Sequence, residues 1–101
     1  MPLLSIITIT YNAEKFIPAT LESILKQSSQ DFEYVVIDGA SKDGTLSIFN
    51  EHAVRLNFLL SEPDTGLYDA MNKGLENAKG KYVWFMNAGD EIAKSYVLVI
   101  I

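Results

Sequence analysis

The sequence has no cysteine and only one histidine, His52, among its 101 residues. Without cysteine the chain forms no disulfide bond and no thiolate metal site. A metal site would therefore be built from oxygen ligands, which suits Mg²⁺ or Mn²⁺ rather than zinc.

Basic residues are also scarce. Eight lysines and arginines stand against thirteen aspartates and glutamates, which gives a net charge of -5. The chain has no basic stripe, so neither nucleic acid nor an anionic membrane surface is an expected partner. A chain this acidic needs something to offset its carboxylates if its ligand is anionic, and a bound divalent cation would do so.

Long hydrophobic runs are missing as well. The opening "MPLLSIITITYN" has no basic segment before it and is interrupted at Asn12, Glu14 and Lys15, too early for a membrane span. We therefore expect no transmembrane segment and a cytoplasmic protein, with peripheral attachment to the inner membrane as an option. Its hydrophobic content of 49% and charged content of 21% are usual for a globular protein, which predicts one domain over residues 1–101.

The last residues, "SYVLVII", are almost entirely apolar. Chain ends are usually polar or frayed, so this tail needs an explanation. We expect either that the domain is truncated at its C-terminus or that the tail docks against a second copy of the chain in a homodimer.

Apolar runs and helical periodicity alternate along the chain. Strands are predicted at residues 3–10, 31–38, 54–62 and 80–87, and helices in 13–27, 45–52 and 67–79. The third helix should bury one face, which consists of Leu67, Ala70, Met71, Gly74, Leu75 and Ala78. The βαβαβαβ order with short connections predicts an α/β fold, a mostly parallel sheet flanked by helices.

Polar residues follow each predicted strand. They are Thr10, Tyr11 and Asn12, then Asp38, then Asp64, and finally Asn87 and Asp90. Taken singly, such acids more often form turns or cap helices, as Ser41 or Asp43 would for the second helix. In a parallel sheet, however, the carboxyl ends of the strands share one edge, where ligands bind. Three carboxylates gathered at that edge indicate a bound cation.

At this point the sequence resembles a known family. The stretches "SIITITYNAEKFIPATLESILKQ", "DFEYVVIDGASKDGT", "SEPDTGLYDAMNKGLENAKGKYV" and "WFMNAGDE" are similar, in order and spacing, to the nucleotide-binding half of family 2 glycosyltransferases with the GT-A fold. The resemblance is strongest to small bacterial enzymes of capsule and exopolysaccharide synthesis. It implies a Rossmann-like domain that binds a nucleotide-diphospho-sugar donor with Mg²⁺ or Mn²⁺, for inverting transfer to a glycan or a lipid-linked acceptor.

The resemblance also implies roles for individual residues in nucleotide binding. Tyr11 would lie against the base, with Thr10 and Asn12 beside it, and Asp38 would accept from the base or ribose. Where a common pattern in the family has a second acid, this sequence has Gly39. In the third segment, Asp64 would line the nucleotide pocket, with Asn72 and Asp69 as further candidates on the helix and Lys73 as a candidate for a phosphate contact.

The "NAGD" stretch stands where the family carries its Asp-x-Asp signature. The two signature positions are Asn87 and Gly89, so Asp90 is the implied metal ligand, Asn87 its neutral neighbour and Glu91 a reserve. The family's catalytic base lies beyond this region, so the catalytic residue is unknown here and the chain by itself is expected to have little or no transfer activity. The alternative is a non-catalytic nucleotide- or phosphate-binding α/β module that resembles a receiver domain.

Overall fold

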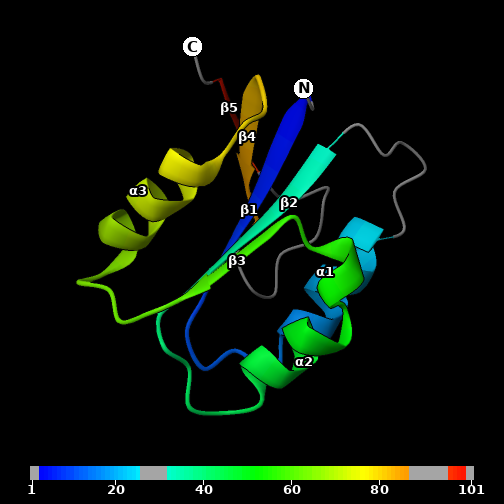
Figure 1. The fold of residues 1–101 in the computed structure, drawn as a ribbon, viewed down its shortest axis with the longest axis vertical. Helices are drawn as coiled ribbons and strands as arrows, with labels where there is room; N and C mark the ends of the chain where they lie inside the picture. The colour runs from blue at the N-terminus through cyan, green and yellow to red at the C-terminus, as the bar shows by residue number, and fades with distance from the viewer. Residues whose placement is uncertain (1–2, 26–31, 87–95, 100–101) are drawn as a thin grey trace.

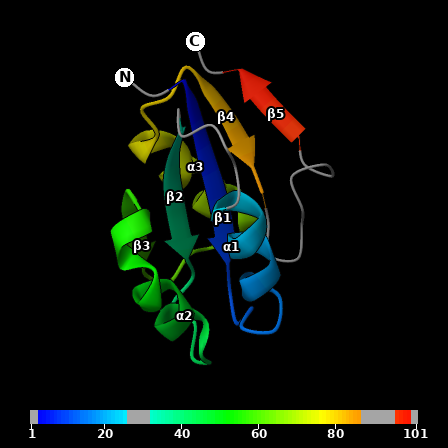
Figure 2. The ribbon, with the colours of Figure 1, turned by 90° about the vertical axis from the view of Figure 1, so that its right-hand side faces the viewer.

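The chain folds around one five-stranded sheet. The computed structural model describes residues 3–25, 32–86 and 96–99. The strands are β1 (Leu4–Thr10), β2 (Phe32–Asp38), β3 (Phe58–Ser61), β4 (Tyr82–Phe85) and β5 (Tyr96–Val99). Their order across the sheet is β3-β2-β1-β4-β5, with β1 to β4 parallel and β5 antiparallel to β4 (Figures 1 and 2).

Helices cover both faces of the sheet. Helices α1 (Ile17–Leu25) and α2 (Thr45–Glu51) lie on one face, and α3 (Leu67–Asn77) lies on the other (Figure 1). Neighbouring strand residues divide between the two layers, so that Ile6 packs towards α1 and α2 while Ile7 packs towards α3. Strands buried on both faces explain the nearly continuous apolar runs of β1 and β2. The predicted α/β class, with a mostly parallel sheet, is confirmed.

Helix α3 approaches the sheet through its smallest residues. Ala70 and Gly74 are buried, and a Cβ added to Gly74 would lie 2.8 Å from Ile7 Cγ2. The predicted apolar face was too wide, because Leu67 and Leu75 are exposed. Two small residues four positions apart bring the helix backbone close to the sheet, and that close approach leaves the larger leucines at the margin of the contact.

One predicted boundary was wrong and one strand was missed. The third strand was expected from residue 54, but residues 53–55 form a short 3-10 helix and Val54 is 98% exposed. The ladder with β2 begins only where Val35 pairs with Phe58. At the other end of the chain, residues 96–99 form β5, an element that the sequence pattern left as an apolar tail.

The amino ends of the strands are joined by a buried polar group. Ser5 Oγ donates to Glu33 Oε2 over 2.5 Å, and Glu33 Oε2 also accepts a hydrogen bond from the Lys79 amide. The Gly80 amide donates to Ser5 Oγ over 2.7 Å. These contacts hold the turn between α3 and β4 against β1, at the end of the sheet opposite the site described next.

Candidate functional site

A pocket of about 480 Å³ opens beyond the carboxyl ends of β1, β2 and β3. Its volume lies within the range of small-molecule sites. It is lined by Tyr11, Gly39, Ala40, Lys42, Pro63, Asp64 and Gly66. Every lining residue follows directly on a parallel strand or lies in the loop after it, which is where ligands bind in sheets of this kind.

Asp38 lies at the centre of the strand ends beneath this pocket. Its side chain is fully buried and its two oxygens accept four hydrogen bonds. Oδ1 accepts from Thr10 Oγ1 at 2.7 Å and Ser41 Oγ at 2.6 Å, and Oδ2 accepts from the Ser41 amide and Ser61 Oγ, both at 2.8 Å. The two oxygens of a carboxylate offer about four acceptor positions, so the protein donors occupy those of Asp38. Through these hydrogen bonds Asp38, at the end of β2, links the ends of β1 and β3 to it.

Thr10 and Asn12 connect the first of these loops to the second. Thr10 is buried, and its carbonyl oxygen accepts the Gly39 amide at 2.9 Å. Asn12 has a positive φ of 49°, which asparagine tolerates better than most residues. Its amide donates to Ser41 Oγ and its Oδ1 accepts the Lys42 amide, each at 2.8 Å. Both residues therefore shape the pocket floor through contacts within the protein.

Asp43 closes the same loop onto α2. Its Oδ1 accepts from both the hydroxyl and the amide of Thr45, and its Oδ2 accepts the Glu14 amide. The hydrogen bond from the Thr45 hydroxyl is the largest cause that holds the pKa of Asp43 below its ordinary value. Of the two capping candidates, Asp43 serves the first turn of α2, whereas Ser41 is bonded to Asp38.

Tyr11 and Asp64 face each other across Gly39. The Tyr11 side chain is 62% exposed, and Asp64 is half-buried. A Cβ built on Gly39 would lie 2.8 Å from Asp64 Oδ2 and 3.5 Å from Tyr11 Cδ1. An aromatic ring and a carboxylate oxygen thus meet over a residue that has no side chain, an arrangement suited to a flat polar ligand.

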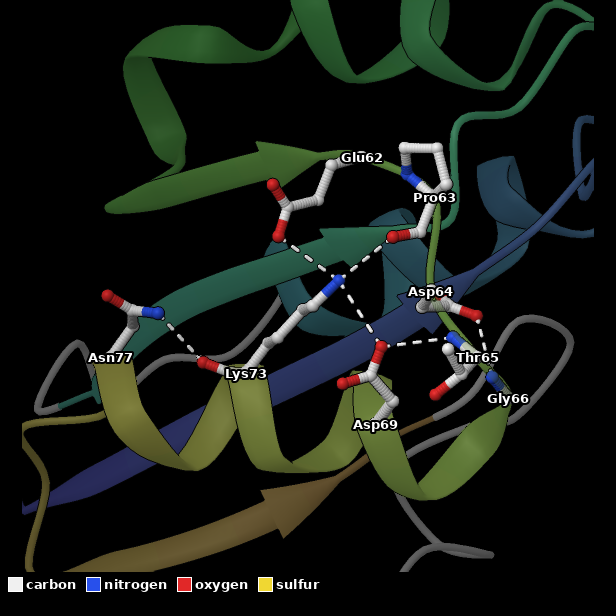
Figure 3. A network of polar contacts seen from close by, with 8 residues as sticks. All are labelled: Glu62, Pro63, Asp64, Thr65, Gly66, Asp69, Lys73 and Asn77. Atoms are coloured by element: carbon white, nitrogen blue, oxygen red, sulfur yellow. Dashed lines mark hydrogen bonds and ion pairs between the residues drawn. The ribbon is translucent and has the colours of Figure 1, made fainter.

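The Asp64 loop is held by a polar network from α3. Lys73 Nζ donates to the carbonyl oxygen of Pro63 at 3.1 Å and pairs with Glu62 Oε1 at 3.1 Å and Asp69 Oδ2 at 3.4 Å (Figure 3). The Lys73 side chain is only 18% exposed. Its hydrogen bond to Glu62 is the main cause that raises the pKa of Lys73.

Asp69 and Asp64 stabilise the turn between them. The Thr65 amide donates to Asp69 Oδ2 at 3.0 Å, and this bond is the largest cause that lowers the pKa of Asp69. The Gly66 amide donates to Asp64 Oδ1 at 3.1 Å (Figure 3). Gly66 itself has a φ of 131°, which only glycine adopts readily. Lys73 and Asp69, two of the candidates on the third helix, therefore hold the loop that carries Asp64.

The sequence-predicted nucleotide residues divide into three groups. Tyr11 and Asp64 line the pocket, while Thr10, Asn12 and Asp38 lie in its supporting frame. Asn72 is exposed on α3 and is not among the described residues that line the pocket. Asn87 and Asp90, the predicted metal residues, lie outside the described residues.

Lys42 is the charged pocket residue that the sequence reasoning missed. Its exposed side chain lines the pocket, and within the described ranges no ion-pair partner is found for it. The signal was its place as the only basic residue in the turn "GASKDGT" that follows β2.

The described residues do not form a metal site by themselves. Across residues 3–25, 32–86 and 96–99, no three His, Cys, Asp or Glu side chains are grouped so as to hold an ion. Both oxygens of Asp38 already accept hydrogen bonds from the protein, so an ion at this edge would need other residues as ligands. None of the helices seen in the described ranges is long and apolar enough to cross a membrane.

The sequence matches glycosyltransferases over most of its length. Residues 5–101 match the family described as Glycosyl transferase family 2. A PGL/p-HBAD biosynthesis glycosyltransferase from Mycobacterium bovis is 41% identical over 100 residues, which cover 96% of this chain and 39% of the relative. The putative teichuronic acid biosynthesis glycosyltransferase TuaG from Bacillus subtilis is 38% identical, with 92% of this chain and 38% of the relative covered.

Solved structures of similar proteins have the same fold. Residues 1–349 of TarS from S. aureus align with a TM-score of 0.81 and 34% identity, over 90% of this chain and 28% of that one. TarS has also been solved in complex with UDP-GlcNAc. The mannosyltransferase PcManGT from Pyrobaculum calidifontis, in complex with GDP-Man and Mn²⁺, aligns with a TM-score of 0.76 and 33% identity, over 87% of this chain and 28% of that one.

These matches agree with the fold and with the four sequence stretches that carry the resemblance. The chain spans about two fifths of the length of the curated relatives that it matches, 39% and 38% for the two described above. The family, in contrast, is established over almost the whole chain: this protein belongs to glycosyl transferase family 2, and its domain has the GT-A type of fold.

Proposed function

We propose that this chain binds the nucleotide-diphospho-sugar donor of a glycosyltransferase in the pocket between Tyr11, Lys42 and Asp64. The observation that carries the proposal is the pairing of an exposed aromatic ring and a carboxylate at the carboxyl ends of parallel strands, in a pocket of about 480 Å³. Similar proteins solved with UDP-GlcNAc and with GDP-Man support the ligand class.

Each residue has a separate task in this proposal. The Tyr11 ring offers a face on which a base stacks, as aromatic side chains do for unpaired bases. Lys42 offers the pocket a cation for a phosphate, which offsets part of the net charge of -5. Thr10, Asn12 and Asp38 would hold the loops of the pocket in place, and a direct contact from any of them to the nucleotide stays a prediction. A contact from Asn72 stays a prediction.

A divalent metal belongs to the proposal as the partner of the two phosphates. Asp90 would hold it, with Asn87 beside it, and their oxygen donors suit Mg²⁺ or Mn²⁺. When bound, such an ion neutralises charge on the diphosphate. The Mn²⁺ in the PcManGT complex supports this assignment.

The proposed reaction is inverting transfer at the anomeric carbon. An acceptor hydroxyl forms a new C–O bond from one face of the sugar as the bond to the diphosphate oxygen breaks on the other. The electron pair leaves with the nucleoside diphosphate, and the hydroxyl proton passes to a base on the acceptor side. No residue of this chain is assigned as that base, so the chain by itself should transfer sugar poorly or not at all.

The acceptor class is inferred from the relatives. Enzymes of PGL/p-HBAD and teichuronic acid biosynthesis are among the similar proteins, which supports a glycan or lipid-linked acceptor in the synthesis of cell-surface polysaccharide or glycolipid. Cytoplasmic location, peripheral membrane attachment and a homodimer through residues 96–101 remain predictions. Antiparallel pairing of β5 with β4 offers the tail a place within its own sheet. Sedimentation at several concentrations tests the dimer, since a strict monomer excludes it.

The experiment that tests the proposal is thermal unfolding of the chain with UDP, GDP, TDP and CMP, each with and without Mn²⁺. A ligand specific for the folded state at a hundredfold excess over Kd adds about 2.7 kcal/mol of stability. In a domain of this size that moves the midpoint by several degrees. We expect a Mn²⁺-dependent shift with at least one diphosphate.

Two variants locate the binding. Lys42→Ala should reduce the shift in the presence and absence of Mn²⁺, whereas Asp90→Ala should abolish only its dependence on Mn²⁺. Lys81→Ala is the matched control, because Lys81 is an exposed lysine that does not line the pocket. If no nucleotide shifts the midpoint of the unaltered chain under any condition, the proposal is wrong.

A further inference from the structure

The side chain of Asp64 occupies the space that a side chain at position 39 would need. The Cβ that any other residue would have at position 39 would lie 2.8 Å from Asp64 Oδ2, closer than real Cβ atoms come to an oxygen. The absence of a side chain at the end of β2 therefore makes room for a carboxylate that arrives from the loop after β3. The pocket receives one acidic side chain at this point, and it comes from residue 64.

The two oxygens of Asp64 have different surroundings. Oδ1 accepts the Gly66 amide at 3.1 Å, which fixes the orientation of the carboxylate. For Oδ2 no donor is found within the described part of the chain, and Asp64 lines the pocket. Asp64 Oδ2 is thus an acceptor that no donor of the described residues occupies, and it lies close to the exposed Tyr11 ring.

The backbone on both sides of Asp64 is also fixed. Lys73 holds the carbonyl oxygen of Pro63, the preceding residue, and Asp69 holds the amide of Thr65, the following one (Figure 3). A loop residue anchored on both sides presents its side chain in a defined place, which is what selection between similar ligands requires.

A free acceptor beside a stacking ring selects among bases by their hydrogen-bonding edge. Uracil, thymine and guanine carry an N–H on the ring nitrogen of that edge, whereas cytosine and adenine carry a lone pair there. A carboxylate oxygen accepts from the first group and is repelled by the second.

We propose that Asp64 is the residue that selects the donor's base, through Oδ2 accepting the ring N–H of uracil, thymine or guanine. The inference rests on the proposed function, since it assumes that a nucleotide occupies this pocket. It assigns to Asp64 a specificity beyond lining the pocket, and to Gly39 the role of leaving space for it.

Isothermal titration calorimetry of the chain with UDP, GDP, CDP and ADP, all in Mn²⁺, tests the assignment. UDP or GDP should bind at least about tenfold more tightly than CDP and ADP, which is the scale of one hydrogen bond to a charged group. Asp64→Ala should weaken binding of the preferred nucleotide by a similar factor and bring the four affinities to within about threefold of one another.

Asp64→Asn is the sharper variant. Its amide oxygen can keep the bond from the Gly66 amide, which turns the NH₂ group into the place of Oδ2. A donor there suits the ring lone pair of cytosine or adenine, so the ratio of UDP or GDP affinity to CDP or ADP affinity should fall below one. This reversal cannot arise from loosening of the loop, which would weaken all four nucleotides together.

Two further variants test the shared space and the overall charge. Gly39→Ala should push the carboxylate aside and weaken binding of the preferred nucleotide, while Gly44→Ala, in the same connection, should not, because its Cβ would meet only the exposed Glu14 side chain. Glu51→Ala, which removes an exposed acid of α2, controls for charge.

The outcomes separate the two proposals. If the unaltered chain binds none of the four nucleotides, the proposed function fails and this inference fails with it. If the chain binds nucleotides but prefers CDP or ADP, or if Asp64→Ala and Asp64→Asn keep the original order of affinities, nucleotide binding stands and the role of Asp64 in selecting the base is wrong.

Discussion

Thr10 Oγ1 donates a hydrogen bond of 2.7 Å to Asp38 Oδ1, between two residues that also pair in register at the ends of β1 and β2. Three further donors, from Ser41 and Ser61, complete the coordination of this buried carboxylate. Asp38, which the sequence predicts as a nucleotide contact, thus joins the ends of β1, β2 and β3.

Replacing Asp38 should therefore affect the fold before it affects binding. Asp38→Ala leaves the buried Thr10 hydroxyl and three part-buried donors of Ser41 and Ser61 without their acceptor, and we expect a loss of about 3 kcal/mol in the free energy of unfolding. Asp38→Asn should lose less, because its amide oxygen still accepts two bonds. Urea unfolding measures both. Glu51→Ala is the control, and equal stability of Asp38→Ala and that control would contradict the assignment.

Lys73 should act on nucleotide binding through the Asp64 loop. Lys73→Met keeps the apolar stem but removes the donor to the Pro63 carbonyl oxygen and the partner of Glu62 and Asp69. We expect the affinity for the preferred nucleoside diphosphate to fall several-fold, with a small change in stability, because ion pairs near the protein surface contribute little to it.

The control for this variant is Lys73→Arg, which retains the charge and the donors and should recover part of the affinity. Calorimetric titration gives the affinities and thermal unfolding gives the stability. A Lys73→Met chain that binds as tightly as the unaltered one would show that the loop does not depend on this network.

The same network should weaken at both ends of the pH scale. Because the folded state lowers the pKa of Asp69 below 3.8, mainly through the Thr65 amide, the associated stability is present above pH 3.8 and is lost as pH falls through the folded value. Because the folded state raises the pKa of Lys73 above 10.5, its contribution is present below pH 10.5 and is lost as pH rises through the folded value.

Midpoints of thermal unfolding across pH would reveal both losses. Asp69→Asn should flatten part of the acidic decline, and Lys73→Met should flatten part of the alkaline one. Asp43 also has a lowered pKa, caused first by the Thr45 hydroxyl, so some acid dependence should survive in Asp69→Asn. Unchanged profiles in both variants would exclude the network as their source.

Gly80 should tolerate substitution poorly. A Cβ there would lie 2.6 Å from both the amide nitrogen and the Oγ of Ser5, and the backbone of β1 cannot move aside. We expect Gly80→Ala to cost about 1–3 kcal/mol of stability, as overpacking does. Gly44→Ala is the matched control, since the flexible and exposed Glu14 side chain can yield. Chemical denaturation of the two variants should separate them clearly, and equal stabilities would contradict the packing argument.

The sequence by itself determined the order of the four parallel strands and of the three α-helices between them, and it placed Thr10, Asp38 and Asp64 at the carboxyl edge of the sheet. These follow from local pattern, because apolar runs, helical spacing and turn residues each act over a few positions. Boundaries failed where the pattern was ambiguous: apolar Val54 and Leu56 looked like a strand, but the ladder with β2 starts at Phe58.

Only the tertiary structure decided which edge residues line the pocket. Asp38 and Asp64 both follow strands and look equivalent in the sequence, yet one is saturated by donors up to 28 residues away and the other keeps an oxygen at the pocket. Likewise, nothing local joins Gly39 to Asp64 or Lys73 to Pro63. Such pairs depend on how distant segments pack together, and packing, not local preference, sets where a side chain ends and what it can bind.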